Sequence, residues 1–343
     1  MRKLYRTIVL SLVLLSLLPA QYRDIPEVVT KVATTAGNWL KLGTSTRAAG
    51  MGGTFVAVGQ GVSAIPYNPA AVAYLQGSEV YLSQTNYIAD ITYNVLSYGK
   101  RLSANDYFGI NLFYLDSGPI GVTTEDFSNG TGEDYHVISM SFRLAYARRM
   151  TDRLKVGITL NYIRDEIYTT NMQSVAFDVG SNFNTGVFGI VLGMSVSNFG
   201  PEVQYSGKGL QIPVADSLDV EGRLSKVTES FPLPLMFRLG LQKDIMGPSP
   251  EATIKNSTHR LTIALDGTNP TDYTIHGNAG IEYSFKEMAF IRAGANIGHD
   301  TAGFAAGGGL LIKLGRLSAR VDYALVDYNI LKLMHQVSIG LEF

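Results

Sequence analysis

The sequence predicts an all-β protein: a transmembrane outer-membrane β-barrel of about 14 antiparallel strands with an N-terminal segment that plugs its lumen. Three observations predict this fold. They are an export signal at the N-terminus, repeated alternation of apolar and polar residues, and connections that alternate between long and tight.

Residues 1–20 have the pattern of a signal peptide. Three basic residues come first: Arg2, Lys3 and Arg6. The apolar run Ile8–Leu18 follows, and the small residue Ala20 precedes a polar Gln21, so we expect cleavage after Ala20. The apolar run has about eleven residues, whereas a membrane-spanning helix needs about 20. The pattern therefore indicates export rather than a helical anchor.

Alternation of apolar and polar residues begins at Ser78. In Leu154–Arg164 every second residue is apolar, which places one apolar face on a strand of about ten residues. About fourteen segments share this pattern: 78–86, 92–101, 106–115, 137–148, 154–164, 174–183, 187–197, 235–244, 258–267, 276–285, 288–297, 304–314, 317–327 and 334–343. A soluble β-sandwich or solenoid is the alternative, but its strands average only about 5–6 residues. The length favours tilted membrane strands and a barrel over residues 78–343.

The connections alternate in length. Asp116–His136 is long and Arg149–Arg153 is short; Asp165–Gln173 is of medium length and Asn184–Gly186 is tight. Outer-membrane barrels have long loops outside the cell and tight turns in the periplasm, so this alternation supports the barrel. Ile245–Ser257 is an exception, because it is long where a tight turn is expected.

The chain ends in an amphipathic strand whose last residue is Phe343. An exposed apolar strand of this kind would be an aggregation hazard in a soluble protein. A terminal aromatic residue resembles the signal that the outer-membrane assembly machinery recognises, and we expect that machinery and outer-membrane lipid to be partners.

Residues 21–77 precede the barrel and are expected to form a periplasmic or plug segment. Pro26–Leu40 has the spacing of a short helix. Arg47–Leu75 is rich in Gly, Ala and Val, and small residues let a backbone approach the barrel wall closely. Pro69 suits the first position of a helix over Ala70–Leu75. A phosphate-binding loop is the alternative, but the third glycine of a dinucleotide motif and the Lys-Ser/Thr of a P-loop are missing.

This segment resembles the opening of the PorV/PorQ family, which are outer-membrane barrels related to the FadL long-chain fatty acid transporters. The matching pattern is R-x-x-GMG, a short apolar run and then NPA. With the neighbouring Gly53, the expected plug motif is Arg47, Gly50, Met51, Gly52, Gly53, Asn68, Pro69 and Ala70. Family sequences often have Trp before NPA, where this chain has Tyr67.

Composition and motifs exclude several functions. The net charge of −1 does not support nucleic-acid binding, which requires a clustered basic face. The absence of cysteine excludes disulfides and zinc–thiolate sites. The five histidines show no metal-binding spacing: His136, His259, His276, His299 and His335. No G-x-S-x-G motif occurs either, so we expect no enzyme, no metal and no cofactor.

Eight charged residues fall on the polar faces of the expected strands: Arg143, Asp178, Arg238, Asp266, Glu282, Arg292, Arg320 and Asp322. Charges inside a barrel must be paired or hydrated. We expect a structural network that ties the plug to the wall; a polar path for a solute is the alternative.

Two functions follow from these features. The first is an accessory role in protein secretion, because the resemblance implies type IX secretion and Asn198–Pro234 is too long for a simple connection. A secretion translocon or a secreted cargo protein would be the partner. The second is FadL-like transport of hydrophobic compounds such as long-chain fatty acids. A general porin ranks third, because an apolar plug opposes an open aqueous channel.

Overall fold

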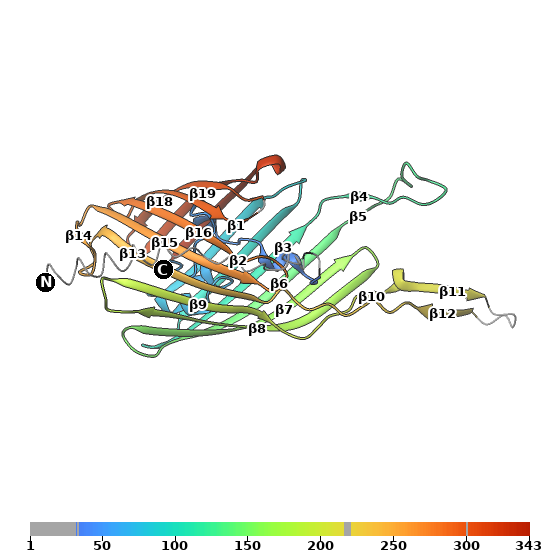
Figure 1. The fold of residues 1–343 in the computed structure, drawn as a ribbon, viewed down its shortest axis with the longest axis horizontal. Helices are drawn as coiled ribbons and strands as arrows, with labels where there is room; N and C mark the ends of the chain where they lie inside the picture. The colour runs from blue at the N-terminus through green and yellow to red at the C-terminus, as the bar shows by residue number, and fades with distance from the viewer. Residues whose placement is uncertain (1–31, 33, 216–220, 300) are drawn as a thin grey trace, which may run out of the picture. The chain divides into compact units, whose positions relative to one another are not determined.

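Fourteen long strands pair in chain order and close into a ring (Figure 1). The structure, a computed structural model, describes residues 32, 34–215, 221–299 and 301–343. The strands of the ring are β1 (Ser78–Asn86), β2 (Thr92–Arg101), β3 (Asp106–Asp116), β6 (Val137–Arg149), β7 (Leu154–Ile167), β8 (Thr170–Asn184), β9 (Ile190–Phe199), β13 (Met236–Gly247), β15 (His259–Pro270), β16 (His276–Phe285), β17 (Ala289–Ile297), β18 (Phe304–Leu314), β19 (Leu317–Asp327) and β20 (Leu333–Glu342).

All pairings around the ring are antiparallel, and β1 pairs with β20 to close it. At this seam Ser78 and Phe343 exchange two backbone hydrogen bonds. The predicted barrel of fourteen antiparallel strands is confirmed. The signal peptide lies outside the described residues, as do residues 26–31 and 33 of the helix predicted over Pro26–Leu40. In the described part, residues 34–37 are not helical, and only the 3₁₀ helix η1 (Asn38–Lys41) forms.

The two faces of the strands differ as alternation requires. Outward side chains are apolar and exposed: Ile291 is 68% and Ile158 53% exposed. The intervening inward positions of β7 carry buried polar residues, including Thr159 and Asn161. An apolar outer face around a polar inner face is the arrangement of a barrel that lies in lipid.

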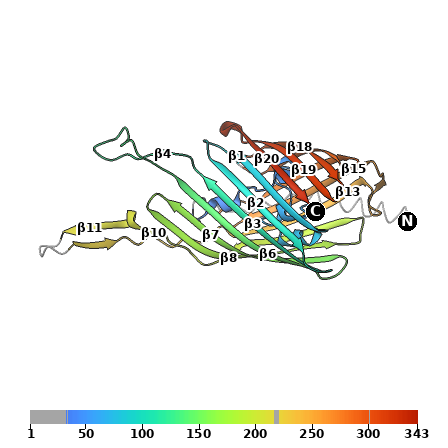
Figure 2. The same ribbon diagram turned by 180° about the vertical axis from the view of Figure 1, so that it is seen from behind.

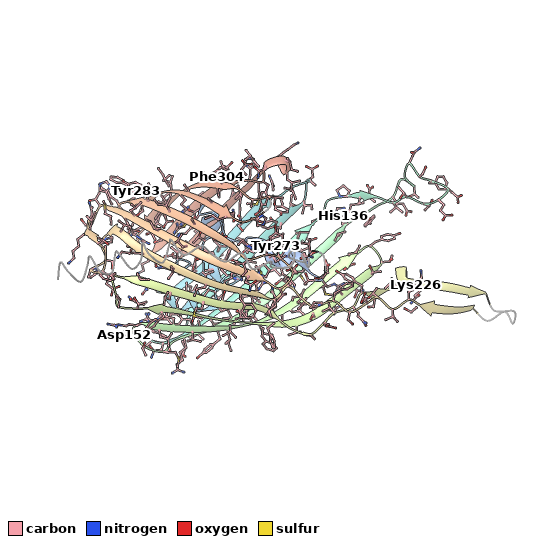
Figure 3. All side chains as sticks on the ribbon, in the orientation of Figure 1. His136, Asp152, Lys226, Tyr273, Tyr283 and Phe304 are labelled. Atoms are coloured by element: carbon pink, nitrogen blue, oxygen red, sulfur yellow. The ribbon has the colours of Figure 1, made fainter. Side chains whose placement is uncertain are left out.

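The two longest connections, between β3 and β6 and between β9 and β13, lie at the same end of the ring. Two extensions stand beyond the end with the long connections, in both views (Figures 1 and 2). One carries β4 (Ile120–Gly121) and β5 (Asp134–Tyr135), and the other carries β10 (Ser206–Gly207), η4 (Lys208–Leu210), β11 (Gln211–Ala215) and β12 (Glu221–Ser225). In Figure 3, His136 and Lys226 lie toward this end, and Asp152 and Tyr283 lie toward the other.

The structure corrects three details of the predicted connections. The medium-length connection Asp165–Gln173 is a tight turn, because β7 and β8 stay paired until Ile167 meets Thr170. The long Ile245–Ser257 contains strand: β13 runs to Gly247, and β14 (Ile254–Lys255) pairs with it in parallel. The predicted helix over Ala70–Leu75 is the 3₁₀ helix η3 (Pro69–Tyr74), with Pro69 at its start.

Among the described residues, no helix is long and apolar enough to cross a membrane.

Candidate functional site

The N-terminal segment, residues 34–77, packs on the inward faces of strands all around the ring. It contains η1 (Asn38–Lys41), α2 (Thr46–Gly50), η2 (Val62–Ala64) and η3 (Pro69–Tyr74). It lies among the barrel strands in both views (Figures 1 and 2). Nearly every residue from Thr44 to Leu75 is buried.

Glycines of the wall make room for the backbone of this segment. A methyl group at any of them would overlap with residues 50–70 or come within about 3 Å of them, and we call this set the glycine belt: Gly157, Gly180, Gly193, Gly240, Gly280, Gly294 and Gly307. Several belt glycines face each other across neighbouring strands, as Gly193 and Gly240 do.

The contacts with the belt follow the order of the chain. Gly50 lies against Gly307 of β18, and Met51 and Gly52 lie against β17 and β16. Further along the segment, Val56 and Ala57 lie against β13 and β9, and Asn68 and Pro69 lie against β8 and β7. The segment therefore runs along the circumference of the wall. The belt was not predicted, although the sequence contains a signal for it: each of these strands carries a glycine at an inward position.

A chain of ion pairs joins α2 to three strands. Arg47 donates from Nε and Nη2 to the two carboxylate oxygens of Glu282, at 2.9 and 2.7 Å. Arg292 donates from Nε to Glu282 at 2.6 Å and from Nη1 to Asp322 at 2.7 Å. Arg320 donates to the other oxygen of Asp322 at 2.9 Å. The side chain of Arg292 is completely buried, so these partners replace its hydration.

Two further carboxylates accept from backbone N–H groups of the segment. Oδ2 of Asp266 accepts from Phe55 and Val56, at 2.6 and 2.9 Å. Oε2 of Glu79 accepts from Val62 at 2.9 Å. Bonds of this kind satisfy donors that cannot reach water and hold the segment in one register on the wall.

Asn68 anchors the NPA turn of the motif. Its side chain is completely buried, and its Nδ2 donates to the carbonyl oxygens of Val56 and Ser181, at 2.8 and 3.0 Å. Its Oδ1 accepts from the N–H of Ala70 at 3.1 Å, which caps η3. An ionised aspartate would lack the donor, and an apolar side chain would lack both groups.

Tyr67 stands where family sequences often have Trp. Its hydroxyl accepts from the N–H of Thr44 at 3.0 Å, and its ring meets Phe55 edge-on at 5.2 Å between centroids. Burial raises the pKa of Tyr67 to about 12, so the phenol stays neutral. The replacement keeps an aromatic ring with one polar atom in a closed space.

The remaining predicted charges lie apart from the chain of ion pairs. Arg143 on β6 and Asp178 on β8 are both buried, and Nε of Arg143 is 3.5 Å from Oδ2 of Asp178. Asp178 also accepts from the N–H of Asn198 at 2.7 Å. Arg238 on β13 donates to Ser197 and Met236.

A cavity of about 150 Å³ lies between the N-terminal segment and the wall. Its polar lining comes mainly from β13, β15, β16 and β17, and it includes Arg238, Asp266 and Asn278. Tyr93, Tyr328 and Met334 contribute a largely apolar side. No group of three or more His, Cys, Asp or Glu in the described part of the chain is placed to hold a metal ion.

The connection between β9 and β13 is anchored at its base. Val203 and Phe231 exchange two backbone hydrogen bonds, and Val203 and Leu233 pack on Leu40 of the N-terminal segment. The Tyr205 hydroxyl donates to Asp165 of β7 at 2.6 Å, and burial together with this bond raises the pKa of Tyr205. Beyond this base, β11 pairs only with β12 among the described strands.

This ring of fourteen strands, polar within and apolar without, defines a β-barrel of the kind that lies in an outer membrane. The family model of the type IX secretion system protein PorV matches residues 26–224, which is more than half of the chain. The chain belongs to the PorV family. No curated protein sequence matches it.

Solved structures of similar fold are outer-membrane transporters and channels. The Pseudomonas putida toluene transporter TodX is 13% identical, with a TM-score of 0.53, over 87% of this chain and 97% of that one. The CymD monoaromatic hydrocarbon channel is 12% identical, with a TM-score of 0.57, over 88% and 98%. A Pseudomonas aeruginosa FadL homologue is 12% identical, with a TM-score of 0.51, over 87% and 97%. At these identities the likeness shows the fold alone.

The barrel fold and the family together point to the outer membrane. The family model describes a secretion system protein, and the solved structures of similar fold are named as transporters and channels.

Proposed function

We propose that this protein is an accessory component of type IX protein secretion that binds a translocon subunit or a secreted protein outside the cell. The observation that carries the proposal is the pair of extensions, β4–β5 and β10–β12, beyond one end of the ring (Figure 1). Each exposes a large apolar side chain: Phe127 is 61% and Val227 82% exposed. Membership of the PorV family supports a secretion role for this surface.

The proposal places the barrel in the outer membrane, with the extensions outside the cell. Long connections of such barrels face outward and tight turns face the periplasm. The apolar outer face supports contact with outer-membrane lipid, and the C-terminal Phe343, 60% exposed, supports recognition by the assembly machinery.

The N-terminal segment is the plug of this barrel in our proposal. The glycine belt, the ion pairs of Arg47 and the cap at Asn68 each fix it to the wall. A lumen filled in this way leaves little space for an open aqueous channel, which supports a binding role over that of a general porin.

A second candidate is transport of hydrophobic compounds across the outer membrane. An apolar groove of about 500 Å³ on the wall favours it, with a lining that includes Met194, Phe237 and Leu239. The experiment below therefore measures lipid binding beside partner binding.

The test removes the distal hairpin and keeps its base. Residues 209–227 are replaced by a short Gly-Ser linker, which removes Val227 and keeps Tyr205, Phe231 and Leu233, because these three are part of the fold. We expect co-purification of a translocon or secreted protein to fall while binding of long-chain fatty acid stays as in the parent. A second variant shortens the other extension within residues 123–131, which removes Phe127 and tests the share of that extension in partner binding. Retained partners together with lost fatty-acid uptake would overturn the secretion role in favour of transport.

A further inference from the structure

The cavity beside the N-terminal segment has a polar wall whose layout follows from strand register. Asp266 on β15 lies opposite Gly240 of β13 and Asn278 of β16. Arg238 of β13 lies opposite Thr268. Arg238 and Asp266 are therefore diagonal neighbours on adjacent strands, roughly 7–8 Å apart in the backbone. The cavity thus has one cationic position and one anionic position on the same wall.

Arg238 has hydrogen-bonding capacity to spare. Its Nη1 donates to Ser197 at 3.0 Å and its Nη2 to the sulfur of Met236 at 3.1 Å. A guanidinium carries five N–H donors, and none of those of Arg238 meets a carboxylate of the described residues at ion-pairing distance.

The carboxylates near Arg238 are committed elsewhere. Asp178 pairs with Arg143, and Asp266 accepts from the N–H groups of Phe55 and Val56. Lys41, which also lines the cavity, pairs with Asp272 at 2.7 Å. Arg238 is therefore the cation on this lining that lacks an anionic partner among the described residues.

The cavity is large enough for one small organic molecule. An apolar protein cavity of about 150 Å³ accepts benzene. Here the lining combines the guanidinium of Arg238 with the aromatic rings of Tyr93 and Tyr328 and the side chain of Met334. The nearby negative charge of Asp266 disfavours ligands that carry more than one negative charge.

We propose that this cavity binds a small monocarboxylic acid with a compact apolar body. The carboxylate lies against Arg238, where a planar guanidinium offers parallel N–H donors. The apolar body packs on Tyr93, Tyr328 and Met334. This inference goes beyond the secretion role and does not depend on it, because the site lies within the barrel and away from the distal hairpin.

The test compares benzoate with benzamide, a neutral molecule of nearly the same shape. Binding to the full chain in detergent micelles is measured by calorimetry. We expect benzoate to bind at least tenfold more tightly than benzamide, and Arg238→Gln to abolish this preference by weakening benzoate about tenfold or more. The matched control is Arg260→Gln, an arginine on β15 outside the cavity, which should bind benzoate as the parent does.

A second variant keeps the test decisive if Arg238→Gln does not fold. Ala302→Leu places extra volume in the cavity and leaves Arg238 in place, so both ligands should lose binding together. Equal binding of benzoate and benzamide to the parent would refute carboxylate recognition. No binding of either molecule would show that the cavity holds only water.

Discussion

Neither the N-terminal segment nor the distal hairpin β11–β12 belongs to the ring of strands, yet the two are held in opposite ways. Most residues from Thr44 to Leu75 are buried, and the segment meets the wall through N–H groups, the ion pair of Arg47 and small residues. The hairpin is tied at its base by Val203 and Tyr205 and pairs only with itself beyond it.

The two regions therefore differ in how strictly their sequence must match the rest of the fold. Residues that match a fixed surface must agree with it atom by atom, so a change on either side is costly. Residues that stand clear of the barrel contribute little to its stability and are free to serve a partner. Four measurements test this contrast, in order of decreasing expected loss of stability.

Glu282→Gln should produce the largest loss of stability. Three arginines, Arg47, Arg292 and Arg320, would then share the single carboxylate of Asp322 in a buried place. Breaking a buried ion pair costs about 3–5 kcal/mol. Urea unfolding of the barrel in detergent measures it. The control is Glu287→Gln, because the partly exposed ion pair of Glu287 with Arg260 should contribute no more than about 1 kcal/mol. Equal losses of stability for Glu282→Gln and Glu287→Gln would contradict the buried network of ion pairs.

Gly52→Ala should follow closely, because two costs add. Gly52 has a φ of +67°, and an added Cβ would lie 2.6 Å from the N of Ala295. The backbone strain costs about 1–2 kcal/mol and the crowding about 1–3 kcal/mol. Gly315→Ala is the matched control, since its φ is +65° and nothing lies near its Cβ position. If both variants unfold at the same urea concentration, the segment is not seated on the wall as described.

Gly280→Ala tests the wall side of the same contact. An added Cβ would lie 2.6 Å from the carbonyl oxygen of Met51, and crowding of this kind costs about 1–3 kcal/mol. Gly267→Ala, on the neighbouring strand β15, meets open space and should change stability by less than about 0.5 kcal/mol. Faster protease cleavage within residues 43–77 should accompany the first change and be absent from the second.

Replacing residues 209–227 by a Gly-Ser linker should have the smallest effect on stability. Its described backbone contact with the barrel is the pairing of β10 with the end of β8, which the linker leaves in place. The unfolding midpoint should stay within about 0.5 kcal/mol of the parent. A larger loss would mean that the hairpin belongs to the fold rather than to a binding surface.

The strands were predictable because alternation is a local property. The ranges 78–86, 92–101, 276–285, 304–314 and 317–327 were predicted with the bounds that the structure has. Errors fell where pairing outlasts the local pattern, as at the tight turn after Ile167, or where a connection adds its own strand, as β14 does.

The interior was only partly predictable, because its contacts join residues far apart in the chain. The inward positions of Glu282, Arg292 and Asp322 follow from alternation, and the motif singles out Arg47. That Arg47 pairs with Glu282 depends on where α2 lies on the wall, and no local pattern encodes it. The same holds for the belt, whose glycines acquire their meaning only when the strands are in register.

The circumferential path of residues 50–70 also constrains the order of folding. A segment that touches β18 at Gly50 and β7 at Pro69 lies along a closed ring, and the ring closes at the seam between β1 and β20. Contacts between the start of the chain and strands near its end form slowly, because long stretches must first be ordered. Seating of the segment and closure of the seam both need strands near the end of the chain, so both are late, non-local steps of folding.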